Sequence, residues 1–133
     1  MRLFNLFKKK SKITDKDLKW NRMWELWVEG KVVSPYSELM TYQSEINNGG
    51  HVQFFDNVAR NSDLLNIMTE LNGILSSALT DNIEKAYSAY LALEKNEDDE
   101  KAQEIIEKCD NVFFENENEI NFILDKFSDA IEL

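Results

Sequence analysis

Residues that could carry out chemistry are few in this 133-residue chain. It has one histidine, His51, and one cysteine, Cys109, and neither has a neighbour at the spacing of a metal site or an activated nucleophile. His51 lies beside apolar residues, where a lone histidine is more often a packed side chain than a catalyst. Cys109 falls on the inward face of its predicted helix, and a buried thiol is inert. We therefore expect no enzymatic activity, no bound metal and no cofactor.

The sharpest backbone signal is the run Asn47-Asn48-Gly49-Gly50, which holds two of the four glycines. Glycine adopts positive φ without steric cost, and asparagine is the next most tolerant residue. The run therefore predicts that a helix over 35–47 ends in a tight reversal and that a second helix follows over 50–59. Because it lacks the flanking strand and the lysine of a phosphate-binding loop, we expect its role to be structural.

The helix over 50–59 separates its apolar and polar residues onto different faces. We expect Phe54 and Phe55 to anchor the turn in the core, while Gln53 and Asn57 bond the backbone of the turn. An alternative is that this region serves an uncharacterised enzyme. That alternative requires an open pocket on which four polar side chains converge, namely Glu45, His51, Gln53 and Asn57.

Glycine and proline are too rare, at four and one, for the many turns of an all-β domain, and apolar residues recur at helical spacing along the chain. The sequence therefore predicts an all-α, single-domain bundle of six or seven helices over residues 13–133, after a basic flexible leader over residues 1–12. Thr14 is predicted to cap the first helix and Thr80-Asp81 the fifth. The expected helices are 15–29, 35–47, 50–59, 63–77, 81–95, 98–113 and 118–131.

Charge is distributed unevenly within the total of −10. Residues 1–22 hold eight Lys/Arg and two Asp/Glu, whereas residues 23–133 hold seven and twenty-three. A strongly acidic domain repels nucleic acid and membrane phosphates and favours a basic protein partner. No apolar run is long enough for a signal peptide or a membrane span, and a single cysteine fits a reducing compartment, so we expect a cytoplasmic protein.

Acidic residues concentrate towards the C-terminus, where residues 94–133 hold fourteen Asp/Glu and four Lys. At a rise of about 1.5 Å per residue, carboxylates three and four residues apart form one helical stripe with steps of roughly 5 Å. Such an edge can imitate the phosphates of DNA, which repeat about every 3.4 Å along each strand, although a solvated acidic face is also common on soluble helices. The residues expected to bind a partner are Glu97, Glu100, Glu104, Glu107 and Asp110.

One stretch carries a family resemblance. Glu45-Ile46-Asn47-Asn48-Gly49-Gly50, followed by Gln53-Phe54-Phe55-x-Asn57, resembles the signature of a bacterial all-helical domain of unknown function found as the C-terminal domain of DNA-mimic proteins. The looser resemblance spans about residues 18 to 128 and includes Cys109-Asp110-Asn111-Val112-Phe113-Phe114. His51 is a departure, since the family pattern leads us to expect an aromatic residue there.

The resemblance implies an all-α fold and, for the characterised type of member, a dimer whose acidic surface occupies the DNA site of a basic DNA-binding protein. The first hypothesis is therefore a non-enzymatic acidic protein that competes with DNA for a basic protein. An immunity or antitoxin-like protein that neutralises a cationic toxin is the alternative, because it would use the same acidity against a different target. Direct nucleic-acid binding is not expected, whereas a homodimer is.

Overall fold

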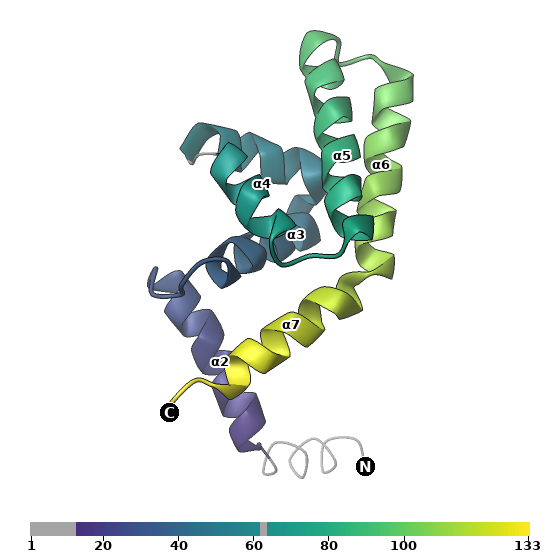
Figure 1. The fold of residues 1–133 in the computed structure, drawn as a ribbon. Helices are drawn as coiled ribbons and strands as arrows, with labels where there is room; N and C mark the ends of the chain where they lie inside the picture. Colours follow the sequence, from purple (N-terminus) through teal and green to yellow (C-terminus); the bar gives the residue numbers. More distant parts are fainter. Residues whose placement is uncertain (1–12, 62–63) are drawn as a thin grey trace, which may run out of the picture. The chain divides into compact units, whose positions relative to one another are not determined.

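Every secondary-structure element in the described part of the chain is a helix. The computed structural model (Figure 1) describes residues 13–61 and 64–133, and within them there is no strand. The predicted all-α fold class is thereby confirmed. The predicted leader over residues 1–12 lies outside the described residues. The helices are α2 (Asp15–Val28), α3 (Tyr36–Asn61), α4 (Leu64–Asn72), α5 (Ser77–Lys95), α6 (Glu100–Glu115) and α7 (Glu117–Asp129).

The helices form two compact units. The terminal unit contains the two ends of the described chain, residues 13–32 and 122–133, and the central unit contains residues 33–121. None of the described helices is long and apolar enough to cross a membrane. The acidic stripe predicted from the sequence and the double glycine both lie in the central unit.

The terminal unit begins with the predicted cap. Thr14 accepts a hydrogen bond from the amide of Asp17, whose carboxylate accepts one from the amide of Thr14, so two otherwise unpaired donors at the start of α2 are satisfied. Lysines of α2 bind the end of α7: Lys19 Nζ donates to the carbonyl of Asp129 at 3.0 Å. The three tryptophans of α2 are half-buried and meet edge to face: Trp20, Trp24 and Trp27.

The central unit has an aromatic core. The helices α5 and α6 run antiparallel as a hairpin (Figure 1), and α3 packs against both and against α4. Side chains from the two halves of α3 meet those of α6, so that ring centroids of neighbouring aromatics lie 5.0–5.4 Å apart in tilted or edge-on contacts. The fully buried aromatic residues are Tyr42, Phe54, Phe55 and Phe113.

The double glycine interrupts α3 without adding a loop. Gly49 has φ −162° and ψ 17°, and Gly50 has φ 75° and ψ −173°, whereas the residues on both sides are helical. The sequence therefore predicted the break at the correct residues, but the two predicted helices follow one another directly. Of these two glycines only Gly50 lies in the left-handed region, where a side chain would be strained.

The start of α5 differs from its prediction. The helix begins at Ser77 and not near residue 81, and Thr80 lies inside it, where its hydroxyl donates to the carbonyl of Ser77. The reason is a cap supplied from elsewhere in the chain. Glu119 accepts hydrogen bonds from the amide of Ser76 at 2.7 Å and from its hydroxyl at 2.6 Å. The start of α5 is therefore set by a long-range carboxylate and not by the local capping motif at Thr80-Asp81.

Candidate functional site

The buried polar centre of the central unit is built around His51, directly after the break in α3. Its ring nitrogen Nδ1 lies 2.6 Å from Asp110 Oδ1, and Nε2 lies 2.7 Å from the hydroxyl of Tyr42. The same carboxylate oxygen also accepts the backbone amide of His51 at 2.9 Å. Since an ionised carboxylate can only accept, Nδ1 carries a proton, and in the neutral ring Nε2 accepts from the tyrosine hydroxyl. We call these three residues the Tyr42–His51–Asp110 chain.

Burial makes this chain a structural centre. The side chain of His51 has 0% of its surface exposed, and its ring lies between those of Tyr42 and Phe55, at centroid distances of 5.6 and 6.2 Å. The histidine thus takes the place of the aromatic residue that the family pattern suggests, while its two nitrogens are both bonded. Burial, and after it the nearby Asp110, holds the pKa of Tyr42 well above its ordinary value. The prediction that His51 is a packed side chain agrees with this geometry.

Asp110 also explains why the second residue of the break is glycine. A Cβ on Gly50 would lie 2.5 Å from Asp110 Oδ2, and the positive φ of Gly50 already disfavours other residues. The carboxylate therefore approaches the backbone as closely as it does because no side chain intervenes. Sequence reasoning placed Asp110 among the surface acids, but the structure gives its carboxylate to His51 in a half-buried position.

The other polar residues of the motif join parts of the central unit. Asn57 donates to Glu45 Oε2 at 2.5 Å across the break, a bond between side chains that the sequence did not predict. Gln53 lies directly over Gly49, which leaves no room for a side chain there. Asn47 donates to Glu117 Oε2 at 2.7 Å. Of the remaining motif residues, Asn48 is exposed, and Phe54 and Phe55 are fully buried, as predicted.

Sequence reasoning did not identify three residues that form these polar contacts in the central unit, namely Tyr42, Gln43 and Glu117. Gln43 is buried and donates to Glu117 Oε2 at 3.0 Å and to Asn121 Oδ1 at 2.8 Å. The position of Tyr42, nine residues before His51, would have suggested a contact only if the geometry of the break had been known. No local signal pointed to Glu117, since its partners are more than 60 residues away.

The predicted partner-binding acids separate into two groups. Glu100, Glu104 and Glu107 lie exposed on one side of α6, and we call these three the acidic stripe. Glu97 is exposed too, but it precedes α6, because Asp99 caps the helix by accepting the amide of Ala102 at 3.0 Å. Glu104 forms an exposed ion pair with Lys108 at 3.1 Å. The fifth predicted residue is the one bonded to His51.

Other chemistry is sparse in the described residues. Cys109 is buried on α6, its carbonyl accepts from Asn82 Nδ2 at 2.9 Å, and burial raises the pKa of its thiol. Within residues 13–61 and 64–133 no group of three or more histidine, cysteine or acidic side chains is placed to hold a metal ion. The exposed groups that share one side of a helix in this region are the carboxylates of the acidic stripe.

The described residues form an all-α protein in which helix α3 breaks at a double glycine over a buried aromatic core and α6 exposes carboxylates. These features define an acidic helical protein of the kind to which the motif pointed. A comparison with protein families identifies it further. The model described as DMP19-like protein, for DNA mimic protein 19, matches residues 37–132, and the chain belongs to this family. The comparisons with curated proteins and with solved structures gave no match.

Proposed function

We propose that this chain is a non-enzymatic interaction protein that occupies the DNA-binding surface of a basic protein. The observation that carries the proposal is the acidic stripe, exposed on α6, in a member of a family named for a DNA mimic. Glu100, Glu104 and Glu107 would supply charges in the place of DNA phosphates, and Glu97 would extend them beyond the start of the helix.

The charge of the central unit supports the same proposal. Residues 33–121 hold eighteen Asp/Glu and five Lys/Arg, so the field around the stripe is strongly negative. Such a field speeds encounter with a basic surface and repels DNA itself. Complexes of this type weaken steeply as salt rises, because exposed charges are screened over about 8–10 Å at physiological ionic strength.

The test is a competition between the protein and DNA for one partner. The immobilised protein captures basic proteins from a lysate of its own cells, and each purified partner is then bound to fluorescently labelled duplex DNA. We expect the wild-type protein to displace the DNA, with an affinity that falls as salt is raised. Glu104→Lys/Glu107→Lys removes two attractions and adds two repulsions, at roughly 0.2–1 kcal/mol each or about 1–4 kcal/mol together, so binding should weaken by at least about fourfold.

The matched control is Glu25→Lys/Glu132→Lys, which makes the same change in net charge at exposed positions of the terminal unit. If the control weakens binding as much as the stripe variant, net charge alone is responsible and the assignment of the stripe is wrong. Captured partners that bind equally well with and without excess duplex DNA would contradict the mimicry. A toxin whose activity is blocked under those conditions would point to the immunity alternative.

A further inference from the structure

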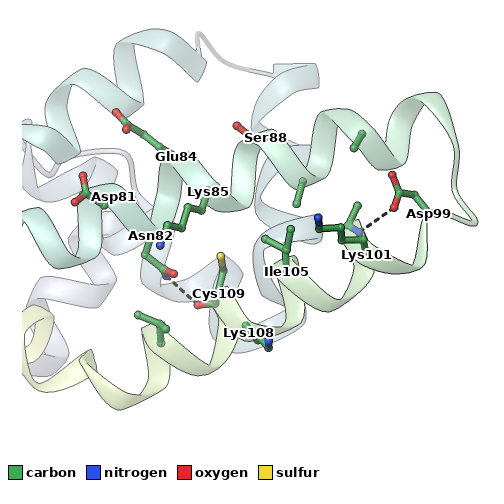
Figure 2. A pocket seen from close by; sticks show the side chains of 14 residues that line it. Asp81, Asn82, Glu84, Lys85, Ser88, Asp99, Lys101, Ile105, Lys108 and Cys109 are labelled. Carbon is green, nitrogen blue, oxygen red and sulfur yellow. Dashed lines mark hydrogen bonds between the residues drawn. The ribbon is translucent and has the colours of Figure 1, made fainter.

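A groove runs along the α5–α6 hairpin. None of its lining residues belongs to the acidic stripe or to the Tyr42–His51–Asp110 chain, although Lys108 of the groove pairs with Glu104 of the stripe. Its volume is about 1030 Å³, and side chains of both helices line it (Figure 2). The buried residues of its floor are Ala89, Ala102 and Cys109, which are small or apolar, and Asn82, whose side chain donates to the carbonyl of Cys109. Between the small side chains Ile105 and Val112 add apolar surface. The floor therefore allows another chain to approach the two helix backbones closely.

The two rims of the groove differ in net charge. On the α5 side the exposed charged residues are Asp81, Glu84 and Lys85, whereas on the α6 side they are Lys101 and Lys108 (Figure 2). The charge of Lys85 lowers the pKa of the Cys109 thiol against the larger effect of burial. An occupant that lies along the groove thus meets an excess of carboxylates on the α5 flank and ammonium groups on the α6 flank.

This balance is unusual in the central unit. The groove is lined by three acidic residues and three lysines, although the unit as a whole has eighteen acids and five cations. Three of those five cations therefore gather in one groove. The acidic stripe would attract a basic surface, whereas the groove presents both positive and negative side chains. The two faces of α6 are thus suited to partners of different chemistry.

We propose that the groove binds an amphipathic α-helix of a partner protein, with apolar residues on its buried face, basic residues along the flank that faces α5, and acidic residues along the flank that faces α6. The groove involves residues 81–92 of α5, a length of roughly 16 Å at about 1.5 Å per residue, which seats about three helical turns. Apolar side chains in the groove supply affinity, and the rims set the orientation of the docked helix. This site does not depend on the proposed DNA mimicry.

The test uses three synthetic helical peptides with one shared apolar face. One peptide has lysine on one flank and glutamate on the other, the second has lysine on both flanks, and the third has glutamate on both. Binding to the full-length protein is measured by fluorescence anisotropy at about 0.5 M salt, where the Debye length of about 4–5 Å suppresses general attraction to the acidic surface. We expect the lysine/glutamate peptide to bind most tightly.

Reversal of one rim should change the preference. In Lys101→Glu/Lys108→Glu both rims are acidic, so the preference should move by about tenfold towards the peptide with two lysine flanks. The control Lys95→Glu/Lys126→Glu makes the same change in net charge at exposed lysines that do not line the groove, and its preference should stay that of the wild type. Circular dichroism confirms that each variant is folded.

Two results would overturn the proposal. One is a wild-type protein that binds none of the peptides or does not distinguish them. The other is a control variant whose preference changes as much as that of the rim variant. Neither result bears on displacement of DNA by the acidic stripe, so this site and the proposed function fail or stand separately.

Discussion

Replacement of His51 by phenylalanine tests whether the Tyr42–His51–Asp110 chain stabilises the central unit through its hydrogen bonds or only through packing. Phenylalanine keeps an aromatic ring between Tyr42 and Phe55 but removes the bonds at 2.6 and 2.7 Å. The amide of residue 51 still donates to Asp110. The tyrosine hydroxyl then lies buried without its partner, and the carboxylate loses one of its two bonds.

The expected loss follows from these two bonds. An unpaired buried hydroxyl costs about 1–3 kcal/mol, and a hydrogen bond to a charged group is worth about 1.5–3 kcal/mol. Water can replace part of the second term, because the Asp110 side chain is 27% exposed. We therefore expect His51→Phe to lower the free energy of unfolding by about 2–4 kcal/mol. Urea denaturation followed by far-ultraviolet circular dichroism measures this change, whereas tryptophan fluorescence would report on the terminal unit.

The double variant His51→Phe/Tyr42→Phe provides the decisive comparison. It removes the unpaired hydroxyl together with its former partner, and replacement of both members of a buried pair by apolar groups is often close to neutral. The double variant should therefore be at least as stable as His51→Phe alone, which gives a coupling energy of about 1 kcal/mol or more. Additive losses, or a His51→Phe variant as stable as the wild type, would refute the assignment of the chain as a stabilising network.

Three further predictions concern single residues. Gly50→Ala should lower the free energy of unfolding by about 1–3 kcal/mol more than Gly30→Ala does, as measured by thermal or urea denaturation. Both glycines have positive φ, but only at Gly50 would the new Cβ lie 2.5 Å from a carboxylate oxygen. Equal losses would contradict this. Because the pKa of Tyr42 is raised in the folded state, the stabilisation that comes from its buried hydroxyl is complete below about pH 10 and is lost as the pH rises further. Tyr42→Phe should therefore reduce the pH dependence of the free energy of unfolding above pH 10 by up to about 1.4 kcal/mol per pH unit. An unchanged slope would contradict the burial of the hydroxyl. Asp99→Ala should lower stability by about 1 kcal/mol through loss of the α6 cap, and Asp99→Asn should restore most of it in the same assay.

The sequence predicted the features that local chemistry controls. The all-α class followed from the shortage of turn residues and the helical spacing of apolar side chains, and the break in α3 followed from Gly49 and Gly50. The cap at Thr14 was predicted because both members of the capping box lie within four residues. The resemblance carried by the motif led to the same family that the comparison identified.

Long-range contacts account for the differences. The start of α5 depends on Glu119, a residue 43 positions from Ser76, so no local motif could place it. Asp110 was counted as a surface acid because α6 has acids along most of its length, and only the approach of Gly50 shows that this one faces inward. Glu97 was counted with the acids of one helical stripe, but α6 begins only at Glu100, after the cap at Asp99.

The last turn of α7 shows how the matched family region depends on residues outside it. Asp125 and Asp129 place carboxylates at the negative end of the helix dipole, an unfavourable position. Lys16 lies 3.7–3.8 Å from both carboxylates, and Lys19 bonds the terminal carbonyl. These lysines belong to α2, which precedes the matched residues 37–132. A fragment cut at residue 37 would lose both α2 lysines and keep only Lys126 as a basic residue in the last turn of α7, so a shortened protein that begins at or before Thr14 should be the more stable.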